Sequence, residues 1–274
     1  MTLFRVLVIF LMVATILGGS VYYSYELFWK PNLPPPPGEV EAPPLPPADP
    51  AVVAYEKVRA VAGQGDRKVE RVALTAFLAK FSDSPQAVEA ANELGSLNAR
   101  RVFSPRETGE DLPYKVQKGD SLVRIASKFK TNAELIYRVN NLETINLQIG
   151  QELHIPKVDM SMVVDPKGRT ITLFDGGAFF KKYPIVSEKM GRSAGKGTTK
   201  VTDKLALQGS DRVAFGSKNY AGCDRWIMLG RPGLVIRGLP EDAGETPPAG
   251  ILLSPSDLEE IFLLVSPGVP VTIE

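Results

Sequence analysis

A proline-rich segment divides this chain into parts that must fold separately. Ten of the twenty residues from 31 to 50 are proline, including an unbroken run from 34 to 37. Proline has no backbone N–H to offer a sheet or a helix interior, so an extended polyproline-type spacer is expected here. At about 3.1 Å per residue, such a spacer reaches roughly 60 Å. We therefore expect a short N-terminal element, a linker over residues 31–50 and compact domains after it.

The N-terminal element is predicted to cross a membrane. Residues 6–23 are apolar apart from Thr15 and Ser20, and as a helix they would span about 27 Å, close to the hydrocarbon thickness of a bilayer. An aromatic cluster follows, as expected at a membrane interface, and consists of Tyr22, Tyr23, Tyr25, Phe28 and Trp29. A cleaved signal peptide is the alternative, but residues 17–20 match its cleavage site poorly. We expect residues 1–30 to be an uncleaved single-pass anchor in the inner (cytoplasmic) membrane, with the remaining domains in the periplasm or extracytoplasmic space.

The composition of the 274-residue chain excludes some classes of partner. Lysine and arginine total 32 against 31 acidic residues, a net charge of +1, so no overall field attracts nucleic acid and no nucleic-acid partner is expected. Cys223 is the single cysteine, which rules out an internal disulfide. We expect neither a metal site nor a cofactor.

Residues 51–103 have the periodicity of three short helices. Ser84 before Pro85 predicts the start of the third, because a serine hydroxyl caps free amides and proline suits the first helical turn. In the second helix an apolar stripe is predicted to be buried, and it consists of Val69, Val72, Ala73, Ala76 and Phe77. Residues 76–95 resemble one tetratricopeptide-type helix-turn-helix, which cannot bury its face alone. Either the first helix completes a small bundle, which we favour, or this surface binds a partner protein. Residues 104–113 are predicted to be a second linker.

Residues 114–157 predict a small strand-helix-helix-strand module. Residues 114–116 form the first strand, and Asp120 or Ser121 caps a helix whose apolar positions recur at i, i+3, i+4 and i+7. Asn132 can cap a second helix through Val139, and residues 152–155 form the closing strand.

This module resembles the LysM domain from end to end. The matching positions are Tyr114, Val116, the turn at residues 119–122, Ile125, Ala126, Asn140, the turn at Gly150 and Gln151, and the closing Ile155 and Pro156. The resemblance implies binding of the N-acetylglucosamine-containing glycan of peptidoglycan or chitin between two loops. These are the opening loop, Gly119, Asp120, Ser121 and Leu122, and the closing loop, Asn146, Leu147, Gln148, Ile149 and Gly150. The alternative for Asp120 and Gly150 is purely structural, a helix cap and a chain turn.

From Met160 onward the periodicity changes to two, which predicts successive β-hairpins. The order of a VDPKGRTITLFDGG hairpin, RWIMLG, a glycine-rich turn and a final SPSDLEEIFLLVSPGVPVTI resembles an L,D-transpeptidase domain over residues 158–274. That family cross-links peptidoglycan with a cysteine nucleophile and histidines. Aligned to its motifs, this chain has Arg237 for the first histidine, Pro248 for the second, Gly250 for the nucleophile and Leu252 for the arginine. The resemblance therefore implies an inactive domain.

Cys223 cannot readily replace the missing nucleophile, because a thiol needs a base to become a thiolate and the single histidine, His154, lies in the LysM-like module.

The sequence thus predicts a multidomain α+β protein: a transmembrane helix, a tetratricopeptide-like helical region over 51–103, a βααβ LysM-like module and a mainly β C-terminal domain. Its leading function is peptidoglycan binding without catalysis. A divergent enzyme using Cys223 and a docking scaffold for cell-wall synthesis proteins are the alternatives.

Overall fold

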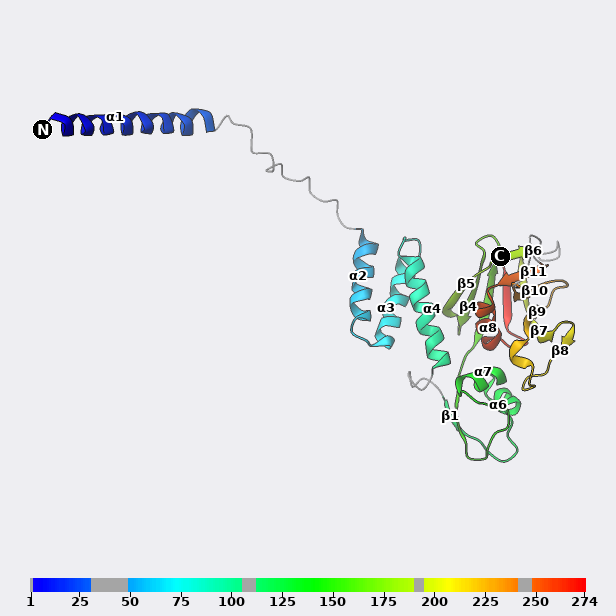
Figure 1. Cartoon of the computed structure of the whole chain (residues 1–274). Coiled ribbons are helices and arrows are strands. Elements are labelled where there is room, and N and C mark those ends of the chain that lie inside the picture. The colour runs from blue at the N-terminus through cyan, green and yellow to red at the C-terminus, as the bar shows by residue number, and fades with distance from the viewer. Residues whose placement is uncertain (1, 31–48, 105–111, 190–194, 241–247) are drawn as a thin grey trace. The chain divides into compact units, whose positions relative to one another are not determined.

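The structure is a computed structural model that describes residues 2–30, 49–104, 112–189, 195–240 and 248–274 (Figure 1). It divides into two compact units, Met1–Ala48 and Asp49–Glu274. Most of the predicted proline-rich linker lies outside the described residues, as does the central part of the second linker. The remaining end of that second linker, Leu112 and Pro113, belongs instead to the first strand of the βααβ module.

The first unit contains one long helix. The α-helix α1 (Thr2–Ser24) continues into the π-helical turn η1 (Tyr25–Trp29). Its apolar part, Val6–Trp29, has 24 residues, a mean hydropathy of 2.2 and no buried side chains. A helix of that length rises about 36 Å, so it is long and apolar enough for a membrane span or a signal sequence.

Three helices open the second unit: α2 (Pro50–Ala62), α3 (Arg67–Lys80) and α4 (Ala87–Phe103). Asp49 caps α2 by accepting from the Ala51 amide, and Asp66 caps α3 by accepting from Lys68 and Val69. All three helices contribute to one apolar cluster, formed by Tyr55, Val58, Leu74, Phe77, Ala90 and Leu94. The first helix thus completes a small bundle, as the favoured interpretation predicted.

Two local predictions in this bundle are wrong. Ser84 does not start the third helix: its hydroxyl donates to the Phe81 carbonyl at 2.9 Å in a turn, and α4 begins three residues later. Val72 of the predicted stripe is 69% exposed, whereas Leu74 is fully buried. The face of α3 that meets α2 and α4 is rotated from the one that periodicity alone selected, because the packing partners on both sides decide which stripe is covered.

The βααβ module consists of β1 (Leu112–Lys115), α6 (Leu122–Phe129), α7 (Ala133–Val139) and β2 (Glu152–Ile155). The two strands pair antiparallel, with Tyr114 opposite Leu153. Ser121 caps α6 and Asn132 caps α7, each through a side-chain oxygen that accepts a backbone N–H. The predicted order of elements is confirmed. Its core contains Val116, Leu122, Ile125, Ala126, Ile136, Leu153 and Ile155.

The β-rich region, residues 160–273, forms a mixed sheet of ten strands within the described residues. The strand order is β5-β4-β3-β12-β7-β9-β10-β11-β6, with β8 paired to β7; only β3–β12 and β10–β11 are parallel. The strands are β3 (Met160–Asp165), β4 (Thr170–Asp175), β5 (Ala178–Pro184), β6 (Ser187–Lys189), β7 (Gly197–Gln208), β8 (Asp211–Arg212), β9 (Asp224–Leu229), β10 (Val235–Gly238), β11 (Gly250–Leu253) and β12 (Pro270–Ile273). Helix α8 (Pro255–Leu264) packs on β9 and β10. The predicted α+β class and hairpins are confirmed.

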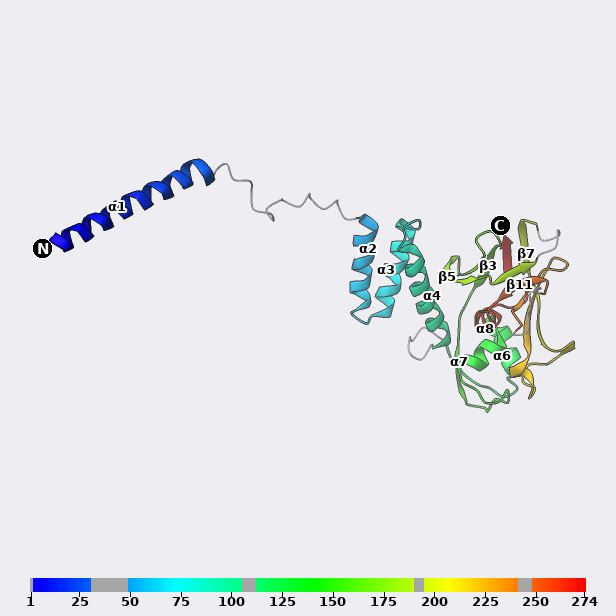
Figure 2. The same cartoon turned by 45° about the horizontal axis from the view of Figure 1, so that its top comes forward.

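Helix α7 belongs to two cores at once. Ile136 lies in the core of the βααβ module, whereas Leu135 and Val139 lie in the large core of the β-rich region. Beside them, the buried Asn132 amide donates to the carbonyls of Phe262, Leu263 and Val265 at the end of α8, at 3.0–3.3 Å. The module is therefore fixed to the β-rich region by side chains and does not hang from a tether. Figures 1 and 2 show α7 next to α8.

Helix α4 covers the edge strand β5 (Figure 2). The Asn98 amide donates to the carbonyls of Phe179 and Phe180 at 3.1 and 2.9 Å, and Arg101 pairs with Asp175 at 2.5 Å. Gly95 permits this close approach, since a Cβ there would stand 2.8 Å from Cγ of Lys181. The helical bundle, the βααβ module and the sheet thus form one body.

Replacing Asn132 should test how strongly the module is held. Asn132→Ala removes both the α7 cap and three buried hydrogen bonds, so we expect the free energy of unfolding of residues 49–274 to fall by about 2–4 kcal/mol. Asn132→Ser keeps a capping oxygen and should recover about 1 kcal/mol of that loss. Urea denaturation measures both, with the exposed Asn146→Ala as the control. Equal, small losses in all three variants would contradict the proposed role of the amide.

Candidate functional site

The structure brings the opening and closing loops of the βααβ module side by side. The Val116 amide donates to the Gln151 carbonyl at 2.9 Å, and the Gly150 amide donates to the Val116 carbonyl at 2.8 Å. Gly150 has a φ of +87°, a conformation that disfavours other residues. Because Val116 leads into the opening loop and Gly150 ends the closing loop, this pairing sets the spacing between the two.

Asp120 holds the opening loop in shape instead of capping the helix. Its carboxylate accepts from the Tyr114 hydroxyl at 2.7 Å and from the Gln117 amide at 2.8 Å. Both hydrogen bonds lower the pKa of Asp120 below its usual value, and the one from the Gln117 amide has the larger effect. Ser121 is the cap, and Arg124 donates to the carbonyl of Gly119 at 2.6 Å. The loop therefore has a defined conformation, held by an Asp120 carboxylate that is ionised at neutral pH.

The predicted ligand-binding side chains divide into exposed and buried sets. Leu122 is only 2% exposed and Leu147 packs against the module core, so both offer a ligand their backbone alone. Asn146 and Gln148 are exposed, and Ile149 is 72% exposed. Val123, which the sequence analysis missed, is 66% exposed next to the opening loop. Val123 lies on the polar face of the amphipathic helix α6, and an apolar residue at such a position could have indicated exposed apolar surface from the sequence alone.

The transpeptidase-motif positions lie on β10 and β11. Arg237 stands opposite Leu252 in this parallel pair, and its guanidinium lies 4.2 Å from the ring centroid of Trp226. Leu252 is fully buried, and Pro248 is half-buried just before the strand. Gly250 has a φ of +124°, and a Cβ there would stand 2.9 Å from the Val235 carbonyl oxygen. The backbone at this position leaves no room for a side chain.

Cys223 and His154 lie elsewhere. The half-buried Cys223 immediately precedes β9, and its Sγ lies 3.1 Å from the Asn219 carbonyl oxygen. In the register of the sheet, Val235 stands opposite Met228 of β9, and Gly250 lies beside Val235. Met228 is five residues after Cys223, so Cys223 lies roughly 17 Å from this level along the strand direction. His154 is half-buried in β2, where its backbone exchanges hydrogen bonds with the Asn140 side chain at 2.7 and 2.9 Å.

Comparison with known proteins supports the module and the β-rich region separately. Residues 114–156 match the LysM domain family. Residues 114–156 are a LysM domain. A Bacillus licheniformis protein named as a candidate L,D-transpeptidase, YkuD, is 24% identical over 172 residues, which cover 59% of this chain and 98% of that protein. The C-terminal region thus resembles L,D-transpeptidases, and both findings associate the chain with the cell wall.

Solved structures show weaker similarity. An L,D-transpeptidase from Mycobacterium smegmatis aligns with 46% of this chain and 64% of its own, at 17% identity and a TM-score of 0.31. An L,D-transpeptidase (Yku) from Stackebrandtia nassauensis aligns with 74% of this chain and 76% of its own, at 12% identity and a TM-score of 0.32. The chain thus spans just under two thirds of the first structure.

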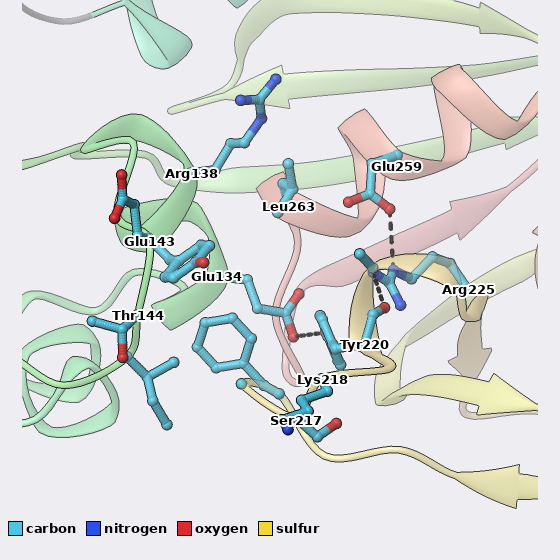
Figure 3. A pocket seen from close by; sticks show the side chains of 15 residues that line it. Glu134, Arg138, Glu143, Thr144, Ser217, Lys218, Tyr220, Arg225, Glu259 and Leu263 are labelled. Atoms are coloured by element: carbon cyan, nitrogen blue, oxygen red, sulfur yellow. Dashed lines mark hydrogen bonds and ion pairs between the residues drawn. The ribbon is translucent and has the colours of Figure 1, made fainter.

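A pocket of about 450 Å³, the junction pocket, opens between the LysM domain and the β-rich region (Figure 3). The LysM domain contributes Glu134, Tyr137, Arg138, Glu143, Thr144 and Ile145; the β-rich region contributes Phe215, Gly216, Ser217, Lys218, Tyr220, Ala221, Arg225, Glu259 and Leu263. The sequence did not predict this site, because its two halves are separated by about 70 residues and meet only through tertiary packing.

Charged groups in and under the lining of this pocket form two ion pairs, one of which crosses the junction. Glu134 of α7 accepts from the Tyr220 hydroxyl at 2.5 Å and lies 3.4 Å from the Lys204 amine. Burial lowers the pKa of Lys204 to about 8, although the Glu134 carboxylate opposes that shift. Arg225 pairs with Glu259 at 3.1 Å, and its guanidinium lies 4.3 Å from the Tyr220 ring centroid.

The Lys204 pKa predicts a pH dependence of stability. Between pH 8 and the ordinary lysine value of 10.5, the unfolded chain keeps a proton that the folded protein has released. The free energy of unfolding should therefore rise with pH in this window, by up to about 1.4 kcal/mol per pH unit. Lys204→Met should lack that rise, whereas the exposed Lys57→Met should keep it. Urea denaturation of residues 49–274 from pH 7 to 10.5 measures the slopes; parallel curves for wild type and Lys204→Met would refute the assignment.

The backbone at Gly250 predicts a cost for any side chain. Gly250→Ala should lower the free energy of unfolding by about 1–3 kcal/mol, because alanine must adopt a positive φ and its Cβ crowds Val235. Gly222→Ala is the matched control: Gly222 has an ordinary φ and open space around it. Chemical denaturation compares the two, and a neutral Gly250→Ala would mean that a cysteine could be accommodated there after all.

Proposed function

We propose that this protein is a single-pass envelope protein that binds the glycan of peptidoglycan through its LysM domain, next to a catalytically silent transpeptidase-like domain. The observation that carries the proposal is the LysM domain itself, with its opening and closing loops joined through Val116. The glycan would lie between these loops.

The chemistry of the loops suits an acetamido sugar. Such a ligand needs polar groups for its amide and hydroxyls and an apolar surface for its methyl group and ring. Asn146 and Gln148 provide exposed amide side chains, while Ile149 and Val123 provide exposed apolar surface. Asp120 fixes the opening loop from within, so its role is to position the groove.

Three features support the absence of catalysis at the family's site. Gly250 stands at the position of the cysteine nucleophile, and its conformation disfavours a side chain. Arg237 stands at the position of a histidine, packed on Trp226, and arginine cannot accept a proton. Cys223 lies roughly 17 Å away along the strands, without a histidine beside it in the sequence.

The N-terminal helix supports an anchor in the inner membrane. Val6–Trp29 exceeds the length needed to span the hydrocarbon core, and its side chains are exposed along the whole helix. The LysM domain would then face the wall from the extracytoplasmic side. Carbonate extraction of membranes, with mass spectrometry of the intact N-terminus, distinguishes this anchor from a cleaved signal sequence.

Wall binding should depend on the closing loop. In detergent, the full-length protein is expected to sediment with insoluble peptidoglycan, and Asn146→Ala/Ile149→Ala should weaken binding about tenfold, equivalent to about 1.4 kcal/mol. Asn92→Ala/Val88→Ala removes an exposed asparagine and an exposed β-branched side chain from α4 and should bind like wild type. The proposal fails if wild type stays in the supernatant or if both double variants behave alike.

The enzymatic alternative has its own test. Incubation of the full-length protein with muropeptides, followed by mass spectrometry, should give neither cross-linked nor cleaved products. A product that disappears in Cys223→Ala would establish the divergent enzyme and end the proposal of a silent domain.

A further inference from the structure

We infer that the junction pocket is a second ligand-binding site, which takes the carboxylate-bearing peptide branch of the wall polymer while the LysM loops hold its glycan. This inference rests on the proposed function for the identity of the polymer. The pocket itself, however, is formed by residues outside both LysM loops, and its contribution can be measured separately.

The position of the pocket connects it to the closing loop. Thr144 and Ile145 line the pocket and immediately precede Asn146, the first residue of the closing loop. Ile145 is wedged against Gly216 of the β-rich region, where a Cβ would stand 2.7 Å from its Cδ1. A glycan lying along the closing loop therefore passes the mouth of the pocket, and a substituent on that glycan can reach into it.

The walls combine aromatic and hydroxyl groups. Phe215 stands between Tyr137 and Tyr220, with edge-to-face ring contacts of 5.5 and 5.4 Å between centroids. Tyr137, Phe215 and Tyr220 are all half-buried and keep part of their surface toward solvent. Aromatic surfaces with nearby Thr144 and Ser217 hydroxyls suit a ligand that is partly aliphatic and partly polar, such as a short peptide.

The unpaired charge at the rim selects for an anion. Two of the three carboxylates that line the pocket are paired: the half-buried Glu134 with Lys204 and Tyr220, and the exposed Glu259 with Arg225. Arg138 and Lys218 are exposed at the rim, and the described residues provide no ion-pair partner for either. Figure 3 places them on different sides of the pocket, and Glu143 is the third carboxylate of the lining, outside these ion pairs. Two free cations against one acid favour a ligand with carboxylates.

The buried Arg225 brings one N–H group without an acceptor to the wall of the pocket. Its Nη1 is buried without a hydrogen-bond acceptor among the described residues, and the side chain is only 8% exposed. Stacking on Tyr220 offsets part of the cost of burying this atom, and the Glu259 carboxylate balances the charge of the guanidinium. The attraction for a carboxylate therefore comes from Arg138 and Lys218 at the rim.

A pair of matched ligands tests the inference. One is a glycan oligomer that carries its stem peptides, and the other is the same oligomer after an amidase has removed them. Titration calorimetry with the full-length protein in detergent measures the affinity for each. Arg138→Gln/Lys218→Gln should bind the peptide-bearing oligomer about tenfold more weakly than wild type and the peptide-free oligomer equally well. Lys57→Gln/Lys68→Gln, the same loss of charge on the helical bundle, should change neither affinity.

The outcomes separate this inference from the proposed function. A selective loss for the peptide-bearing ligand supports the junction pocket. If Arg138→Gln/Lys218→Gln binds both oligomers like wild type, or weakens both equally, the pocket does not take the peptide and the inference is overturned, while glycan binding by the loops stands. If wild type binds neither oligomer, the proposed function fails and the inference fails with it.

Discussion

The buried face of α7 is the constraint on which the rest of residues 49–274 depends. One side of this seven-residue helix completes the LysM core and the other enters the core of the β-rich region, while Asn132 ties its start to the end of α8. An amide that satisfies three buried carbonyls cannot rotate freely without leaving them unpaired, which is costly in a water-excluded setting. The orientation of the LysM loops is consequently fixed by the neighbouring region.

Because the orientation is fixed, the β-rich region can have a structural role in ligand binding that requires no catalysis. It supplies the far wall of the junction pocket and holds Ile145 through Gly216. A LysM domain on a flexible tether would meet its glycan in any orientation, whereas here the glycan loops and the adjoining wall meet a ligand as one surface. Preorganisation of this kind lowers the entropic cost of binding.

Local patterns were sufficient to predict much of this molecule. The heptad-like spacing in α6, the caps at Ser121 and Asn132 and the hairpins of the β-rich region depend on neighbours in sequence, and all are present. Failures occurred where distant parts meet. Val72 follows the helical period but faces solvent, and the turn at Ser84 delays α4, because packing between helices decides the buried face. Asn132 donates to the end of α8, and the junction pocket joins two regions of the chain; the residues involved are about 70 to 130 positions apart, a separation that no local pattern encodes.

The contact between α4 and β5 also determines which pieces of this protein can be studied alone. β5 is an edge strand, and its outer carbonyls at Phe179 and Phe180 are satisfied by Asn98 of the helix. A fragment that begins after the helical bundle would present that edge, with Phe179 beside it, to other copies of itself. Unpaired edges of this type template strand addition and aggregation. The helices therefore act as the cover of the sheet, and recombinant work on the wall-facing domains should retain them.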